Sequence, residues 1–222
     1  MHGKENMRRV KAYFLFTGWR YKLGIFLGLP TVVLTGGLLW RRFLAPQGYG
    51  IFVTLLVIFI EVLTDQGVFA GIQSHSGYKL DYLKTSPAGP KVLRQGLAGD
   101  LVRRMLTALL CAGICGIVDA EKAVGGWAGY LGMALVIYGM EALGLLISRF
   151  TRSAVLRIWI IYGCMLLGVL LYFLVWLIGQ PAILIMDGIL ALGAAAASIA
   201  AVRTAMKKWL QTYLDGQEAL VQ

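Results

Sequence analysis

The sequence has 222 residues, of which 59% are apolar and only 14% are charged, with a mean hydropathy of +0.73 and a formal net charge of +10. A soluble domain carries about 45–50% apolar and about 25% charged residues, so this composition excludes a soluble globular enzyme, a disordered regulator and a disulfide scaffold. Because the apolar excess must face lipid, we expect an all-α membrane protein with one transmembrane domain over residues 1–222. The three cysteines lie in apolar stretches without metal-ligand spacing and are interpreted as small core residues.

The N-terminal residues 1–22 mix basic and aromatic side chains. On a helix, Val10, Tyr13 and Phe14 would share one side, with Arg20 away from it. This pattern predicts an amphipathic helix that lies along the inner leaflet before the first span. A simple anchor and a gating or docking role both remain open.

A helix that crosses the hydrocarbon core needs about 20 mostly apolar residues. The sequence predicts six such spans, the third of which is extended by a helix containing Arg103 and Arg104. The spans are Leu23–Trp40, Tyr49–Ile72, Met105–Val118, Trp127–Ser148, Val155–Ile178 and Pro181–Val202. The first lacks the small-residue cleavage site of a signal peptide, so we expect it to be retained.

Lysine and arginine are distributed unevenly between the expected loops. If the N-terminus is inside, all but three of the 21 basic residues fall on the cytoplasmic side, the exceptions being Arg41, Arg42 and Lys122. Cytoplasmic loops are the ones enriched in Lys and Arg, so both termini are expected to be cytoplasmic in a plasma-membrane protein. The basic charge is thereby explained by membrane topology, and no nucleic-acid partner is expected.

The longest polar connection, residues 73–104, joins spans two and three. A short helix over 77–84 would place Leu80 and Leu83 together, and Pro87 would end it because the residue before a proline avoids helical geometry. Pro90 suits the first turn of a second helix that continues into span three. The segment is therefore expected to form a cytoplasmic elbow, either a docking surface or an ordinary interfacial loop.

A Leu-x-x-Ser-Pro turn after a short apolar-acidic helix, followed by a long helix into the third of six spans, resembles the permeases of type-2 ABC transporters. The resemblance implies that the short helix is a coupling helix seated in a groove of a separate ABC-type ATPase. The coupling residues it implies are Tyr78, Leu80, Asp81, Tyr82, Leu83, Lys84, Thr85, Ser86 and Pro87. It also implies that ATP and Mg are bound by that partner, that this chain is no enzyme and holds no cofactor, and that it forms a homodimer or a heterodimer with a second permease. The chain departs from the family at Gly179–Pro181, a tight turn where such permeases usually carry an outer re-entrant hairpin.

Four carboxylates fall within the expected spans: Glu61, Asp65, Glu141 and Asp187. A charge in the hydrocarbon core costs about 2.5–3.5 kcal/mol even on insertion scales, so each should face protein or water. Glu61 and Glu141 are expected at similar depth in the inner half, where they either line a translocation path or form structural pairs. Asp65 and Asp187 are expected near the interfaces.

Small residues predict where helices pack closely. In span six Gly193, Ala197 and Ala201 are spaced by four, and span four contains Gly132 and Gly139. Such spacings let helix backbones approach one another, most often within one chain.

No G-x-x-x-x-G-K-[ST] loop occurs in the sequence, so ATP hydrolysis by that route is not expected in this chain, and no metal site is expected. The favoured interpretation is the membrane-spanning permease subunit of an ABC exporter, with its substrate open. One alternative is the substrate-binding membrane subunit of an energy-coupling importer, with Gly24 and Gly28 as a docking surface. Others are a membrane-embedded enzyme using Glu61, Asp65 and His75, and a non-catalytic scaffold or immunity protein.

Overall fold

The computed structural model describes residues 22–43, 49–73, 86–118, 126–148, 159, 162, 163, 166, 167, 170 and 180–221. Within this part the chain forms helices and turns and no strand, which confirms the all-helical prediction there. In chain order the helices are η1 (Gly24–Gly28), α3 (Leu29–Phe43), α4 (Tyr49–Gln73), α6 (Gly89–Val118), α7 (Trp127–Ser148) and α9 (Gln180–Val221).

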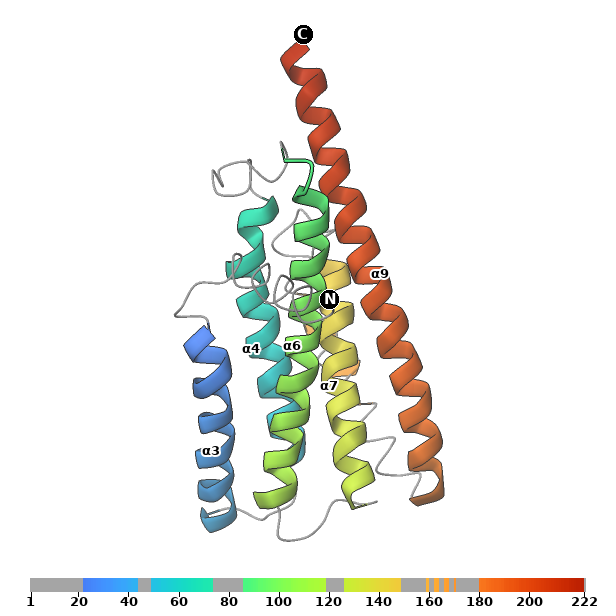
Figure 1. The fold of residues 1–222 in the computed structure, drawn as a ribbon. Helices are drawn as coiled ribbons and strands as arrows, with labels where there is room; N and C mark the ends of the chain where they lie inside the picture. The colour runs from blue at the N-terminus through green and yellow to red at the C-terminus, as the bar shows by residue number, and fades with distance from the viewer. Residues whose placement is uncertain are drawn as a thin grey trace, which may run out of the picture.

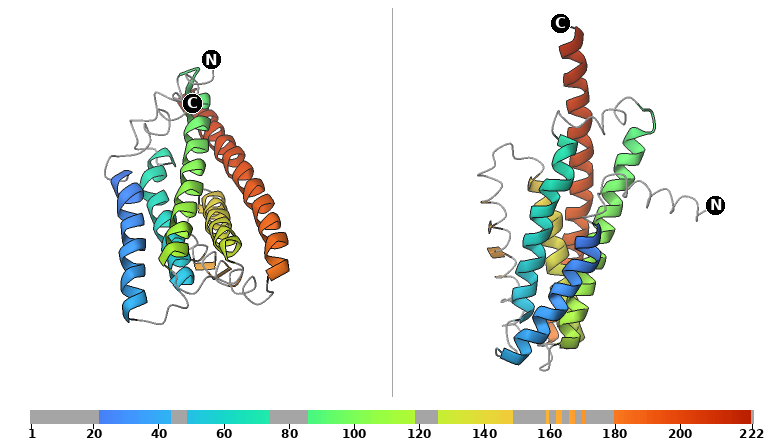
Figure 2. Two further views of the ribbon diagram at one scale, coloured as in Figure 1. Left: turned by 60° about the horizontal axis from the view of Figure 1, so that its bottom comes forward. Right: turned by 90° about the vertical axis from the view of Figure 1, so that its left-hand side faces the viewer.

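The helices lie side by side in an elongated bundle (Figure 1). α3 and α6 run towards one end of the bundle, whereas α4, α7 and α9 run towards the other, where the C-terminal part of α9 extends beyond its neighbours (Figures 1 and 2). α7 packs most extensively against α9 and also contacts α4 and α6, and α3 packs mainly against α6. α6 and α7 are therefore the central pair of the bundle.

Five of the six predicted spans coincide with helices. α7 has the predicted bounds, and α4 begins at Tyr49 as predicted and ends one residue later. α9 continues to Val221, well past the predicted Val202, because the end of an apolar run does not itself end a helix. The fifth span lies largely outside the described residues, and so does the predicted N-terminal interfacial helix apart from Lys22.

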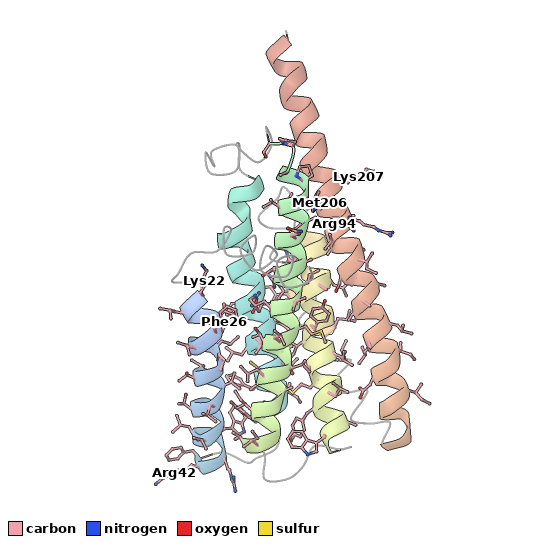
Figure 3. All side chains as sticks on the ribbon, viewed as in Figure 1. Lys22, Phe26, Arg42, Arg94, Met206 and Lys207 are labelled. Atoms are coloured by element: carbon pink, nitrogen blue, oxygen red, sulfur yellow. The ribbon has the colours of Figure 1, made fainter. Side chains whose placement is uncertain are left out.

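Three of the described helices are long and apolar enough to cross a membrane: Gly24–Phe43, Gly89–Val118 and Asp187–Thr204. The described side chains of α4 and α7 form shorter apolar stretches. Large apolar side chains on α3, α6 and α9 point outward, among them Leu38, Ile117 and Leu192, and Figure 3 shows side chains along the outer faces of these helices. Outward apolar faces of this extent mark a membrane-associated protein.

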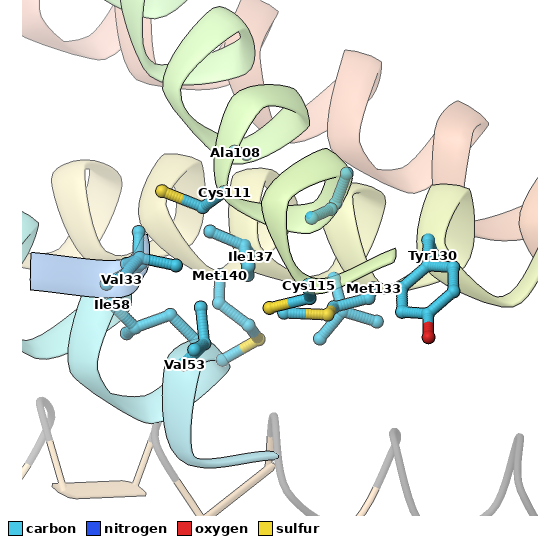
Figure 4. Packing of buried hydrophobic residues seen from close by; sticks show 14 of the residues in the cluster. Val33, Val53, Ile58, Ala108, Cys111, Cys115, Tyr130, Met133, Ile137 and Met140 are labelled. Carbon is cyan, nitrogen blue, oxygen red and sulfur yellow. The ribbon is translucent and has the colours of Figure 1, made fainter. Parts of the chain in front are cut away.

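One continuous core joins α3, α4, α6 and α7 (Figure 4). Cys111 and Cys115 of α6 are buried in it, in agreement with their interpretation as small core residues. The residues of this core are Leu29, Val33, Tyr49, Val53, Val57, Ile58, Ala108, Cys111, Ala112, Cys115, Tyr130, Met133, Ala134, Val136, Ile137 and Met140.

The first span does not begin as a regular α-helix. Gly24–Gly28 form a turn of π-helix, η1, in which the Leu29 N–H donates to the Gly24 carbonyl. Pro30 follows directly and has no N–H to offer to the carbonyl four residues earlier, so a widened turn at this point removes the need for that bond.

α3 approaches α6 and the start of α4 closely at Gly37. A Cβ at Gly37 would lie 2.8 Å from Val118 Cγ1 and 2.9 Å from Tyr49 Cε1, so there is no room for a side chain. The Tyr49 hydroxyl donates to the Val33 carbonyl, and its ring lies 5.8 Å from that of Trp40. Together these contacts fix the docking of the first helix.

α9 packs on α7 through two of the three small residues predicted to do so, Ala197 and Ala201. Ala194, Ala197 and Ala201 are buried, whereas Gly193 is exposed and its Cβ position meets no described atom within 4 Å. The prediction for Gly193 was therefore wrong, because spacing by four is shared by neighbouring faces of an alanine-rich helix.

Candidate functional site in the bundle interior

Glu61 of α4 and Arg103 of α6 form a buried ion pair between two helices. Arg103 Nη2 donates to Glu61 Oε2 at 2.7 Å, and Nη1 donates to Oε1, so the contact is bidentate. Glu61 is 0% exposed and Arg103 3% exposed. A bidentate guanidinium–carboxylate pair is strong and fixes the orientation of both groups, so it determines how α4 and α6 face each other.

Asp100 and Arg104, also on α6, complete this network. Arg104 Nε donates to Asp100 Oδ2 at 2.9 Å, and Arg103 Nε donates to Asp100 Oδ1 at 3.2 Å. Arg104 Nη1 lies 3.3 Å from Glu61 Oε2. Residues three and four apart share a helix face, which is why one aspartate reaches both arginines. We call Glu61, Asp100, Arg103, Arg104 and their neighbour Glu141 the charge cluster.

Glu141 brings α7 into the charge cluster. It is 0% exposed, and neither carboxylate oxygen has a hydrogen-bond partner among the residues that the structure describes. It lies close enough to Glu61, Asp100, Arg103 and Arg104 to interact electrostatically with all four. The sequence placed Glu61 and Glu141 at similar depth, and the structure brings them into one cluster.

Asp187 is a second buried carboxylate, and it lies at another level of the bundle. It is 6% exposed, with both oxygens lacking a hydrogen-bond partner within the described part of the chain. A Cβ at Gly132 of α7 would lie 2.5 Å from its Oδ1, so the glycine makes room for the carboxylate. Gly132 precedes Glu141 by nine residues, about 13 Å along a helix, so Asp187 stands apart from the charge cluster.

A hydrogen bond ties α7 to α9 between these two levels. The Tyr138 hydroxyl lies 2.7 Å from Ser198 Oγ, which in turn donates to the Ala194 carbonyl. The described interior of the bundle therefore has polar groups at three depths, although its packing is otherwise apolar.

The other predicted site residues are described only in part. Asp65 belongs to α4, but its side chain lies outside the described set, and so do the predicted coupling residues 78–85 and His75. Glu61, Glu141 and Asp187 are all buried against protein, as expected for carboxylates that avoid lipid.

The start of α6 agrees with the second helix predicted for the elbow. The Gly89 N–H donates to the Ser86 carbonyl at 2.9 Å, and the Ala88 N–H lies 3.3 Å from Ser86 Oγ. Pro90 occupies the first turn, and the helix then runs without a break to Val118. A proline costs nothing there because the first N–H groups of a helix have no partner within it.

Arg103 and Arg104 were expected to belong to the basic cytoplasmic elbow, but both are buried in the bundle. The reason is physical: three carboxylates lie within electrostatic range of them, and pairing lowers the cost of burial for both signs of charge. Asp100 went unrecognised in the sequence. Its spacing of three and four residues from the two arginines, beside the apolar Leu97 and Leu101, was the available signal.

Within the described residues no group of three His, Cys, Asp or Glu side chains could hold a metal ion. No protein-family model, curated protein or solved structure matches this chain. Its function is therefore argued from the sequence and the site.

Proposed function

We propose that the chain is the membrane-spanning permease subunit of an ABC exporter, driven by a separate ATPase that binds ATP and Mg. The observation that carries the proposal is the continuity of α6. This helix begins at Gly89, two residues after Pro87, the end of the predicted coupling segment, and carries Arg103 and Arg104 to Glu61 in the interior. A displacement of the elbow would thus act on the ion pairs that hold α4 against α6.

A topology of six spans with both termini in the cytoplasm belongs to this proposal. Lys22, Arg94 and Lys207 lie towards one end of the bundle and Arg42 lies at the other (Figure 3). α7 and α9 run in the same direction, so the chain must cross back between them, which fits the fifth predicted span. The end with the larger number of basic residues would face the cytoplasm of the cell.

The permease would function as a homodimer or as a heterodimer with a second permease in the plasma membrane. Among the described residues, the interior is apolar apart from the charge cluster, Asp187 and the hydroxyl groups, which suits an amphiphilic substrate such as a peptide, a drug-like molecule or a lipid-linked compound. The alternative of an embedded enzyme is less favoured, because the bidentate pair with Arg103 makes Glu61 a poor general base.

The importer alternative has one observation in its favour. Gly24 is exposed with no described atom within 4 Å of its Cβ position, and Gly28 is exposed with only the Leu23 backbone oxygen nearby. This face of η1 is therefore open to a partner helix, as a docking surface on the first span would require.

The test is an affinity capture of the tagged full-length chain in mild detergent, followed by identification of bound nucleotide-hydrolysing proteins. We expect an ABC-type ATPase with the unsubstituted chain and its loss when Asp81→Ala is combined with Leu83→Lys. Arg42→Ala, at the opposite end of the bundle, is the matched control and should retain it.

Three other results would contradict the proposal. If no ATPase is captured with the unsubstituted chain, the assignment as a permease subunit is wrong. If the ATPase is still captured with the elbow variant, the predicted coupling segment is not its binding site. Capture that is instead lost with Gly24→Leu and Gly28→Leu supports the importer alternative.

A further inference from the structure

The charge cluster contains more carboxylates than cations. Glu61, Asp100 and Glu141 stand against Arg103 and Arg104, and all five side chains are buried. If every group were ionised, the cluster would carry one uncompensated negative charge in the interior of an apolar bundle. An isolated ionised carboxylate is very costly to bury and takes up a proton or finds a partner instead.

The contacts within the cluster show which of its members lacks a charged partner. Arg103 is bonded to both Glu61 and Asp100, and Arg104 pairs with the same two carboxylates. Glu141 accepts no hydrogen bond from any described residue. The excess charge therefore falls on Glu141, and neutralising it there disturbs none of the existing ion pairs.

The remaining surroundings of Glu141 supply no further cation in the described part of the structure. From α6 the Cys111 thiol interacts with it, and from α9 the alanines Ala197 and Ala201 pack beside its neighbour Ala142. A bound metal ion would need several ligands, whereas a proton needs a single carboxylate oxygen.

We propose that Glu141 is a proton-binding site at the centre of the bundle, which holds a proton taken from water while both arginines are engaged by Glu61 and Asp100. A conformation that moves Arg103 or Arg104 from Glu61 to Glu141 would exchange the protonation states of the two glutamates, so that Glu141 gives up its proton and Glu61 takes one. The site thereby links protonation to the relative positions of α4, α6 and α7. This inference goes beyond the proposed function and does not depend on an ATPase partner.

The test is infrared spectroscopy of the full-length chain in lipid nanodiscs at neutral pH, with ¹³C in the glutamate side-chain carboxyls. Protonated and ionised carboxyls absorb at different frequencies, and the isotope separates glutamate from aspartate. We expect a protonated, labelled carboxyl band that shifts in heavy water. Absence of such a band from the unsubstituted chain would overturn the proposal without any variant.

Two substitutions assign the band to one residue. Glu141→Asp keeps an acid at the site, so the labelled band should be replaced by an unlabelled one. Asp187→Asn, which alters the other unpartnered buried carboxylate of the described residues, should leave the labelled band unchanged. A labelled band that persists in Glu141→Asp, or disappears in Asp187→Asn, contradicts the assignment.

A third substitution tests the charge balance itself. Glu61→Gln leaves two carboxylates against two arginines, so Glu141 should become ionised and the protonated band should be lost although Glu141 is still present. Persistence of the band in Glu61→Gln would show that the arginines do not control the proton, and would overturn the proposed link.

Discussion

At the scale of single residues, Arg103 shows how a buried charge constrains this bundle. Its guanidinium donates hydrogen bonds to carboxylates on two helices, Glu61 of α4 and Asp100 of its own helix. Such pairs gain little stability relative to apolar packing, but removing one partner leaves the other buried and unpaired. The arginine therefore acts mainly by fixing the arrangement of α4 on α6.

Arg103→Gln should lower the free energy of unfolding by about 3–5 kcal/mol, because Glu61 and Asp100 both lose a charged partner in a buried site. The measurement is denaturation of the purified chain in mixed micelles. Arg94→Gln is the matched control, since Arg94 lies on the same helix but is exposed, and its effect should be within about 0.5 kcal/mol.

The double variant Arg103→Gln with Glu61→Gln should lose less than the sum of its single substitutions, because the two groups interact directly. Additive losses would contradict the pairing of Arg103 with Glu61.

The sequence predicted the carboxylates of the charge cluster better than their partners. Glu61 and Glu141 stand out because a carboxylate within an apolar run must be compensated. Arg103 and Arg104 lie where a basic loop meets a span, so the counting of charges assigned them to the cytoplasmic surface. Their pairing with Glu61, which is 42 residues from Arg103 in the chain, depends on how α4 packs on α6, which no local pattern records.

At the scale of helices, apolar run length located the elements but not their full extent. α7 matches its run, whereas α6 begins at Gly89 and α9 ends at Val221, both outside the apolar stretches. A run of apolar residues marks the part of a helix that suits lipid. The helix itself extends further, up to a residue such as Pro87 that disfavours helical geometry. The contact between α7 and α9 was harder to predict, because several faces of an alanine-rich helix look alike.

The docking of α3 offers a test at this scale. Gly37→Ala should destabilise the chain by about 1–3 kcal/mol, because the new methyl group would overlap with Val118 Cγ1 and with the Tyr49 ring, whose hydroxyl is bonded to α3. The same denaturation assay measures it.

Gly36→Ala is the matched control on the neighbouring residue. Its methyl group would lie 3.6 Å from the Tyr49 hydroxyl, an ordinary contact, so stability should be unchanged or slightly higher. Combining Gly37→Ala with Val118→Ala should recover part of the loss. Equal losses of stability in Gly37→Ala and Gly36→Ala would show that α3 does not pack at Gly37 as described.

At the scale of the whole molecule, the proposed topology depends on where the basic residues lie. The basic residues of the sequence favour one side, and in the folded chain Lys22, Arg94 and Lys207 lie towards one end while Arg42 lies at the other. The orientation of the bundle is therefore a prediction that can be tested directly.

Cysteine labelling in intact cells tests this orientation. In a chain with its three native cysteines replaced by alanine, a membrane-impermeant maleimide should label Arg42→Cys from outside, because this exposed position would face the exterior. The positions of Arg94→Cys and Lys207→Cys are also exposed, and these cysteines should react only after the cells are permeabilised. Labelling of the last two in intact cells would show that the bundle has the opposite orientation in the membrane. The elbow before α6 would then lie outside the cell, where no ATPase could reach it, and the coupling proposal would fail together with the topology.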